Sequence, residues 1–368
     1  MVTPKEAARA REEIVRLGNR GLPVAAYSRA VGRALTKVVP AEGSCLMTVD
    51  PATLLPTAEY VENGMPAPAL LRMVDIELRE PDFNKWVTLT QSRTPAASLS
   101  GATRGDLDAS LRQREIRRPG GFSDELRSVL ASGTGTWGQL TVFRELRRPY
   151  FSSAEVAFVS SIAATIADGL RRAMLLDRVR SELDDVGVLV LDSDDHVTLT
   201  NPAAQRWLDD LGPGNRTGSA LPLAVSTTVR QARAVGTVAD SRDRSEPLRP
   251  AVARVRTTGG AWLIVRGSLM GQGPDAPVTV ILEPAKPAQL APLIVRAYGL
   301  TDAERRVTEL VARGLSTQLI AHRLNLSTYT VQDHLKSIFT KSDTGSRGDL
   351  VARLFVDHYA NGLTSGSD

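Results

Sequence analysis

Residues 300–355 constrain the fold of this chain more than any other stretch, because four short helical patterns follow one another there with brief polar turns between them. Thr301 and Glu304 have the spacing of a capping box, in which each side chain accepts a hydrogen bond from the backbone N–H of the other residue. Gly314 is suited to end this first helix, since helix C-termini favour a residue with left-handed backbone. A second helix is predicted from about Thr317 to Leu324. The residues expected to face inward in these two helices are Val307, Leu310, Val311, Leu319, Ile320 and Leu324.

A third helix is predicted after the turn Asn325-Leu326-Ser327, and Ser327 is a good N-cap for it. Its apolar residues recur at helical spacing on one stripe, which is an amphipathic pattern. These residues are Val331, Leu335, Ile338 and Phe339. Two helices joined by a three-residue turn, the second with a polar outer face, make the helix-turn-helix arrangement.

Residues 300–355 resemble the C-terminal DNA-binding domain of LuxR-type (GerE-type) transcription regulators. The matching pieces are Leu-Thr-x-x-Glu at the start, Gly-Leu-Ser, Ile-Ala-x-x-Leu, Ser-x-x-Thr-Val-x-x-His, and Ser346-Arg347 before the fourth helix. The match runs without a gap. The sequence departs from the family at Gln332, where Lys is most frequent, and at Asp343-Thr344, which replace Gly-Val. The first departure bears on base preference and the second on the flexibility of the turn.

The polar face of the third helix carries the predicted DNA contacts, because the N-terminal part of this helix enters the major groove in a helix-turn-helix. Gln332 is suited to read adenine, Asp333 to accept from the amino group of cytosine, and Lys336 to reach guanine or phosphate. His334 lies at the edge of the apolar stripe, which favours a structural or phosphate-contacting role. The alternative is a merely solvated helix face. The predicted contact set is Ser327, Thr328, Tyr329, Thr330, Val331, Gln332, Asp333, His334, Lys336, Ser337, Lys341 and Arg347.

The charge of this domain is low for a DNA-binding module. Residues 293–368 hold nine Arg or Lys against eight Asp or Glu, a net charge of +1, which is a weak electrostatic footprint. Dimerisation would compensate for weak binding by one copy. The fourth helix supports a dimer, because its apolar residues spread over more of the helix than one small domain buries. They are Leu350, Val351, Leu354, Phe355, Val356 and Tyr359.

Residues 1–152 are predicted to form a sensory domain of helices and strands. The segment WGQLTVFRELRRPYFSSAEVAFVSSIAATIADGLRRAM resembles the end of a GAF-type domain. Strands are expected at Ser44–Asp50 and Asn84–Leu89, and more strand at Gly133–Arg144. Residues Thr94–Arg118 are assigned to no element.

Residues 153–184 are predicted as one connecting helix. Its apolar residues recur at steps of three and four, near a heptad seam. They are Val156, Val159, Ile162, Ile166, Leu170, Ala173, Leu176 and Val179. The pattern fits a helix packed on its own domain and a two-chain coiled coil about equally well.

Residues 185–283 are predicted as a second sensory domain. The segment GVLVLDSDDHVTLTNPAAQRWLDDL resembles the opening of a PAS domain, a hairpin followed by Asn-x-Ala and a helix. Strands at Ala251–Arg256, Ala261–Leu269 and Pro277–Leu282 would complete an antiparallel sheet, with polar loops at Gly212–Gly218 and Val235–Arg249. Residues 284–292 follow as a stiff Pro-rich linker. The helix-turn-helix domain is then placed at 293–362 and a disordered tail at 363–368.

The residues that other chemistries require are missing from the sequence or wrongly spaced in it. The single Cys45 excludes an internal disulfide and suits a reducing cytoplasm. No signal peptide or run of eighteen apolar residues is present. A phosphorylated receiver is disfavoured, since no paired acids precede Asp50. Residues 186–282 hold no Cys for a flavin adduct, and the His residues, His196 among them, lack metal spacing. We therefore predict no enzyme activity, no metal and no cofactor.

The fold class predicted is multidomain: two α+β sensory domains, GAF-like and PAS-like, with antiparallel sheets, followed by an all-α, four-helix, helix-turn-helix domain. The function predicted is a cytoplasmic, homodimeric, sequence-specific regulator of transcription whose dimer is modulated through the sensory domains. Its partners would be double-stranded DNA, a second copy, a small-molecule effector and RNA polymerase, with no membrane. The alternatives are a constitutive DNA-binding protein whose sensory domains only dimerise or bind a protein, and an enzyme with a site in Thr94–Arg118.

Overall fold

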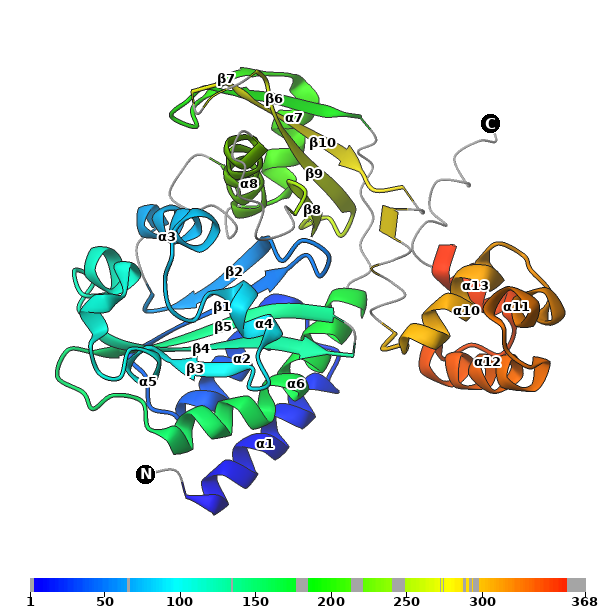
Figure 1. Cartoon of the computed structure of the whole chain (residues 1–368), viewed down its shortest axis with the longest axis horizontal. Helices are drawn as coiled ribbons and strands as arrows, with labels where there is room; N and C mark the ends of the chain where they lie inside the picture. The colour runs from blue at the N-terminus through cyan, green and yellow to red at the C-terminus, as the bar shows by residue number, and fades with distance from the viewer. Residues whose placement is uncertain are drawn as a thin grey trace. The chain divides into compact units, whose positions relative to one another are not determined.

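The computed structural model describes residues 3–64, 67–133, 135–176, 185–212, 221–239, 249–271, 273, 275–286, 289–290, 293 and 298–355. The chain divides into two compact units. The larger consists of Met1–Ala131 and Thr136–Pro284, and most of the smaller lies in Ala285–Asp368. Figure 1 shows the larger unit in blue to yellow and the helices of the smaller in orange to red.

The first domain of the larger unit is built on a five-stranded antiparallel sheet in the order β2-β1-β5-β4-β3. The strands are β1 (Gly43–Val49), β2 (Pro56–Glu62), β3 (Ala96–Ser98), β4 (Phe122–Ser132) and β5 (Gly135–Glu145). Three helices cover one face: α1 (Pro4–Gly18), α2 (Val24–Thr36) and α6 (Ser153–Leu176). The Tyr27 ring lies against Gly169 of α6, where any Cβ would collide with it, and its hydroxyl donates to Ile166 O at 3.1 Å. The α+β prediction for this domain is confirmed.

Helix α6 packs within its own domain over the part that the structure describes. Its heptad-spaced residues Val159, Ile162, Ile166 and Leu170 are fully buried, and the helix contacts α1, α2 and β3. This region therefore follows the interpretation of a helix packed on its own domain, and residues 177–184 lie outside the described residues. The segment Ser153–Met174 is long and apolar enough to cross a membrane by length and composition, with a mean hydropathy of 1.2, but half of it is buried inside the protein. That burial is typical of a core helix.

The opposite face of the first sheet carries two other helices. Helices α3 (Ala67–Arg79) and α4 (Trp86–Gln91) lie there. The strand expected at Asn84–Leu89 is wrong: Trp86 and Leu89, three residues apart, are both buried, which is helical rather than strand spacing. The unassigned stretch Thr94–Arg118 contains β3, α5 (Leu99–Ala102), a 3-10 turn (Leu107–Ala109) and a π-helix (Gln113–Arg117).

The second domain of the larger unit has a second antiparallel sheet in the order β7-β6-β10-β9-β8. Its strands are β6 (Gly187–Leu191), β7 (Val197–Thr200), β8 (Val252–Arg256), β9 (Trp262–Leu269) and β10 (Val278–Pro284). The hairpin and the three later strands expected from sequence are confirmed. Asn201 caps α7 (Pro202–Asp210) by accepting from Ala204 N at 2.8 Å, and the same oxygen accepts from Val188 N at 3.0 Å. The Asn-x-Ala motif therefore joins the hairpin to the helix.

Helix α8 (Leu223–Ala239) belongs to the cores of both domains. The loop expected from Val235 onward is wrong as far as Ala239, because these residues belong to α8. Residues 240–248 lie outside the described residues, and so do residues 213–220, where most of the other expected loop falls. The helix contacts β9 of the second sheet on one side and β2 and α3 of the first domain on the other (Figure 1). Leu223 packs in a cluster with Met47 and Trp86 of the first domain. The two sheets are therefore parts of one packed body.

Buried polar contacts reinforce this junction. The Asp50 side chain is fully buried, and its Oδ2 accepts from Arg254 N at 2.8 Å and from Arg254 Nη1 at 2.9 Å. Its Oδ1 accepts from Ala52 N at 2.8 Å. Arg230 of α8 pairs with Asp75 of α3. Asp50, which follows β1, thus joins the two domains.

The smaller unit contains the helices α10 (Asp302–Ala312), α11 (Thr317–Leu324), α12 (Thr328–Ser342) and α13 (Arg347–Phe355). These helices confirm the predicted all-α class. Leu319, expected inside, is 58% exposed, because Ile320 and Ala321 form the buried face of α11 and Leu319 lies to one side of it. The core residues of these helices are Val307, Leu310, Val311, Ile320, Ala321, Val331, Leu335, Ile338 and Leu350.

The predicted linker 284–292 is covered only in part. Pro284 is the last residue of β10 rather than the first of the linker, and Gln289 and Leu290 are helical. Pro287 and Pro292 lie outside the described residues, as does the predicted tail 363–368.

We predict that Asp50→Ala destabilises the larger unit by roughly 2–4 kcal/mol, since it removes a buried acceptor from the Arg254 guanidinium and from two backbone N–H groups. All four tryptophans lie in this unit, so urea unfolding followed by tryptophan fluorescence measures the change. The matched control is Asp106→Ala, which removes an exposed carboxylate. Equal stability of the two variants would contradict the role given to Asp50.

Candidate nucleic-acid interface

The turn between α11 and α12 fixes where the recognition helix begins. Asn325 ends α11 with left-handed backbone, φ 55° and ψ 46°, a conformation that Asn adopts at low cost. Ser327 then caps α12 by accepting from Thr330 N at 3.0 Å, and the hydroxyls of Ser327 and Thr330 are hydrogen bonded at 2.8 Å. This short turn therefore fixes the residue at which α12 begins and the rotation of α12 about its own axis.

The outer face of α12 is exposed. Tyr329 is 72% exposed, and Thr328, Gln332, Asp333 and Lys336 are exposed as well. Among the described residues, the side chains of Gln332, Asp333 and Lys336 have no ion pair or hydrogen bond. Their donors and acceptors are therefore available to base edges and phosphates.

Other members of the predicted contact set have different roles. Val331 is fully buried in the domain core, so its side chain cannot contact a base. The Ser337 hydroxyl and the Lys341 ammonium bind Glu304 of α10. Arg347 donates to Leu315 O at 2.9 Å and to Thr317 Oγ1 at 3.0 Å, which joins the start of α13 to the start of α11. The remaining member, His334, is half-buried.

Glu304 connects α10 to α12, a role that its place in the capping box alone does not reveal. Its side chain completes the capping box with Thr301, accepting from Thr301 N at 2.7 Å. It also accepts from Ser337 Oγ at 2.6 Å and from Lys341 Nζ at 2.6 Å. Burial raises the pKa of this carboxyl, but the hydrogen bonds from Lys341, Ser337 and Thr301 outweigh it and lower the pKa to about 2. The carboxylate therefore stabilises the orientation of α12 against α10 at neutral pH.

The geometry at the C-terminus of α12 explains why Asp343 can stand where LuxR-type domains favour Gly. Asp343 is the capping residue and has left-handed backbone, φ 53° and ψ 51°. Gly adopts this conformation without strain, which accounts for the glycine that the family prefers there. The turn reaches the same left-handed geometry with Asp.

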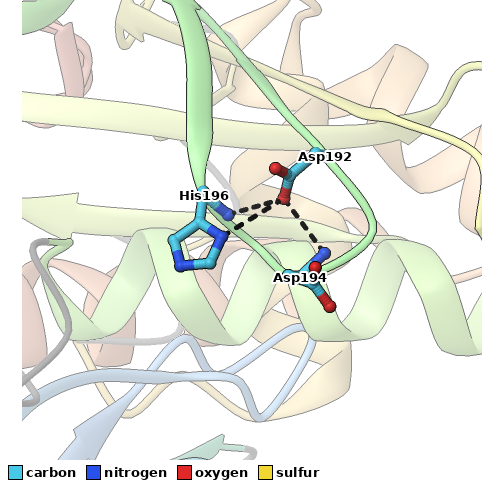
Figure 2. A group of neighbouring side chains, drawn as sticks. All are labelled: Asp192, Asp194 and His196. Atoms are coloured by element: carbon cyan, nitrogen blue, oxygen red, sulfur yellow. Dashed lines mark hydrogen bonds and ion pairs between the residues drawn. The ribbon is translucent and has the colours of Figure 1, made fainter.

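In the larger unit, Asp192, Asp194 and His196 are a group of described residues whose ligand atoms lie close enough for a metal ion (Figure 2). They lie at the β6–β7 turn, where Asp194 and His196 are exposed. Asp192 Oδ1 accepts from Asp194 N at 3.0 Å and from His196 N at 2.9 Å, so this oxygen already stabilises the turn. A solvated turn explains the cluster without a ligand.

The lowered pKa of Glu304 predicts a pH dependence of the smaller unit. Because the folded-state pKa, about 2, lies below the usual value of 4.5, the stabilisation is complete above pH 4.5 and is lost as the pH falls from 4.5 towards 2. Glu304→Gln should remove this dependence and destabilise the unit by roughly 1–3 kcal/mol. The measurement is amide hydrogen exchange of α12 in the full chain, corrected for intrinsic rates. Glu309→Gln is the control, since Glu309 is exposed; a Glu304→Gln protein with unchanged acid sensitivity would refute the assignment.

Comparison with known proteins identifies the helical unit. Residues 299–354 match the family model described as GerE: Bacterial regulatory proteins, luxR family. A monoamine regulon transcriptional regulator from Klebsiella aerogenes is 40% identical over 57 residues, which are 16% of this chain and 25% of the relative. A putative HTH-type transcriptional regulator in the exeN 3' region from Aeromonas salmonicida is 42% identical over 59 residues, 16% of this chain and 30% of the relative. The chain thus matches less than a third of the length of either relative.

Two solved structures resemble the chain only distantly. The GAF domain of the Acinetobacter phosphoenolpyruvate-protein phosphotransferase has a TM-score of 0.29 at 13% identity, covering 47% of this chain and 97% of that domain. The Vibrio cholerae VqmA dimer has a TM-score of 0.19 at 15% identity, covering 46% of this chain and 81% of that chain. The family match and the helical geometry agree for the smaller unit: residues 299–354 are a LuxR-type, or GerE-type, helix-turn-helix domain.

Proposed function

We propose that the protein is a regulator of transcription that binds specific double-stranded DNA through the outer face of α12. The observation that carries the proposal is the exposed face of Tyr329, Gln332, Asp333 and Lys336, whose side chains form no ion pair or hydrogen bond with other described residues. The Gln332 amide offers the donor and the acceptor that pair with adenine, and the Lys336 ammonium can donate to guanine or to phosphate. The two relatives, both transcriptional regulators by name, support the same function.

Exposed basic residues near α12 would contact the phosphate backbone of the DNA. Arg306, Arg313 and Arg323 are exposed, and no described residue forms an ion pair with them. Lys341 and Arg347, by contrast, are held by contacts within the unit. Loss of the latter two would alter the position of the helices rather than a direct contact with phosphate.

We further propose that the active species is a cytoplasmic homodimer whose DNA binding is modulated through the larger unit by an effector, with RNA polymerase as a further partner. The support is the low net charge of one helical domain and the apolar character of α13. Leu350 is fully buried in its own domain, so residues that follow Leu350 in the sequence would form the dimer contact. The side chains of Leu354 and Phe355, and all of Val356 and Tyr359, lie outside the described residues. We assign a sensing role and no catalytic role to the two α+β domains, which are predicted to be GAF-like and PAS-like.

We expect Lys336→Ala and Gln332→Ala each to weaken specific DNA binding by about 1–3 kcal/mol, because each removes a base-directed hydrogen-bonding group. Binding is measured by fluorescence anisotropy on a duplex selected by the unmodified protein from random sequences. Lys5→Ala is the matched control, because it removes an equal charge at an exposed position in the larger unit. Unchanged affinity in both α12 variants would refute the recognition face.

The dimer proposal predicts a near-palindromic operator with half-sites roughly one helical turn apart, as two-fold symmetry requires. Leu354→Asp combined with Phe355→Asp should abolish cooperative binding while tryptophan fluorescence shows the larger unit still folded. Footprinting on the selected duplex checks the operator. Protection of one asymmetric half-site would argue against dimeric binding.

A further inference from the structure

Helix α12 contains one acidic residue, Asp333, and this residue lies at the centre of the outer face. Val331, Leu335 and Ile338 form the buried stripe of the helix. Because successive residues of an α-helix are rotated by about 100°, Asp333 points almost directly away from that stripe. Any docking that brings the outer face of α12 into the major groove therefore places the Asp333 carboxylate against base edges.

The charges on this face nearly cancel. Helix α12 contains two lysines, and one of them, Lys341, is paired with Glu304 of α10. The other, Lys336, is exposed, and its side chain, like that of Asp333, forms no ion pair or hydrogen bond with another described residue. One carboxylate thus faces the DNA beside one ammonium group. The outer face therefore adds little net attraction for phosphates, and general affinity has to come from other basic residues.

An ionised carboxylate restricts the base that can lie against it, because it offers only acceptors. In the major groove guanine presents two acceptors and thymine presents the O4 acceptor. Adenine presents a donor next to an acceptor, whereas cytosine presents only a donor, its N4 amino group. A carboxylate that has lost water and faces another acceptor is unfavourable. Cytosine is therefore the base that fits Asp333 without an opposing acceptor.

The phosphates make the same position costly on any other sequence. A carboxylate in the groove is repelled by the charge of the DNA backbone whatever the sequence is. Only a base that donates to it offsets this repulsion. Specificity is a difference between affinities, and it can come from rejection of wrong partners as well as from attraction to the right one. The position of Asp333 suits rejection.

We propose that Asp333 is a specificity-determining residue, which selects a cytosine at one fixed position of each half-site and rejects guanine and thymine there. Gln332 and Lys336 supply attraction, and Asp333 supplies the discrimination against wrong sequences. This role rests on the DNA binding proposed above and deepens it. Removal of the carboxylate should relax specificity without loss of general affinity.

The first test is a base-pair scan of the selected duplex with the full chain, by fluorescence anisotropy. At one position of the half-site the unmodified protein should prefer cytosine over guanine and thymine by roughly fivefold to 150-fold. Asp333→Asn keeps the shape of the side chain but adds a donor, and Asp333→Ala removes the contact, so both variants should lose this preference. A base profile that is unchanged in both variants overturns the proposal.

Binding to a duplex of unrelated sequence separates this role from a structural one. Affinity for that duplex should rise roughly twofold to fivefold in Asp333→Ala, since a charge that phosphates repel is removed. Asp349→Asn is the matched control, because it removes an exposed carboxylate from α13 of the same domain, and it should keep the base profile of the unmodified protein. Uniform loss of affinity for all duplexes in the Asp333 variants would show a structural role and overturn the proposal.

A modified base tests the contact at a single atom. N4-methylcytosine still pairs with guanine through its remaining N–H, so the methyl group replaces the hydrogen that faces the major groove. At the assigned position this base should weaken binding of the unmodified protein roughly fivefold or more. It should leave Asp333→Ala nearly unaffected, because the shorter side chain makes no contact there. Equal sensitivity of the two proteins would show that the carboxylate does not contact the amino group and would overturn the assignment.

Failure of this role can be distinguished from failure of the proposed function. If the unmodified protein enriches no duplex from random sequences, specific DNA binding is wrong, and the role of Asp333 is wrong with it. If a duplex is enriched but its base profile does not depend on Asp333, specific binding stands and only the role of Asp333 is overturned.

Discussion

The burial of α8 is the constraint on which the larger unit depends. A helix at a protein surface has one apolar stripe, whereas α8 is buried from Leu223 to Ala234 apart from half-buried Arg230. Such a helix needs neighbours on both sides. It obtains them from β9 of the second sheet and from β2 and α3 of the first domain. Separation of the two domains would therefore expose a helix face that each of them now helps to bury.

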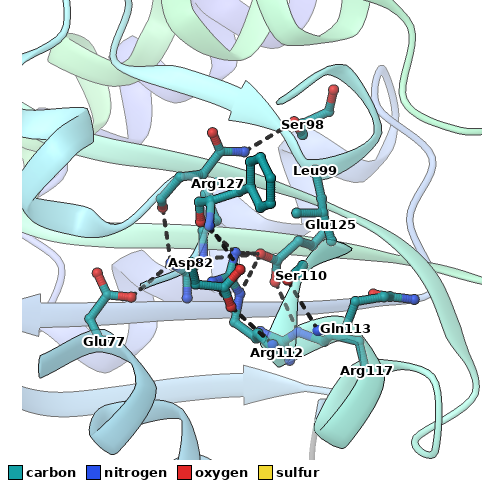
Figure 3. Close-up of polar contacts among 12 residues, drawn as sticks. Glu77, Asp82, Ser98, Leu99, Ser110, Arg112, Gln113, Arg117, Glu125 and Arg127 are labelled. Carbon is teal, nitrogen blue, oxygen red and sulfur yellow. Dashed lines mark hydrogen bonds and ion pairs between the residues drawn. The ribbon is translucent and has the colours of Figure 1, made fainter. Parts of the chain in front are cut away.

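Charge burial in the first domain likewise depends on neighbours. Arg112, Arg117 and Arg127 are nearly inaccessible, and each lies within ion-pair distance of Glu125 (Figure 3). Burial raises the pKa of Glu125, but the three guanidinium groups outweigh it and hold that pKa far below its usual value. Charges buried in this way are stable only as a complete set, because removal of one partner leaves an uncompensated ion. The network therefore fixes the position of Arg127 and, through the stacking of its guanidinium on the ring, that of Trp86.

The helical unit separates positioning from recognition. Glu304, Ser337 and Lys341 hold α12 against α10, and Arg347 holds α13 against α11. None of these contacts uses the side chains of Gln332 or Lys336. The exposed face can therefore differ between relatives without any change in the packing that presents it.

The sequence by itself determined the elements whose signals are local. The capping box at Thr301, the N-cap at Ser327, the helix-turn-helix domain and the hairpin with Asn201 all follow from residues close together in the chain, and the structure has each of them. Only the tertiary structure decided the role of α8. Its sequence contains polar Thr227, Thr228 and Gln231 and so does not indicate a helix that is buried between two sheets. The tertiary structure also decided that Val331 and Lys341 of the predicted contact set serve the core and Glu304. The physical reason is that burial and pairing depend on residues far away in the sequence, and periodicity within one helix shows which residues share a face but not what covers it.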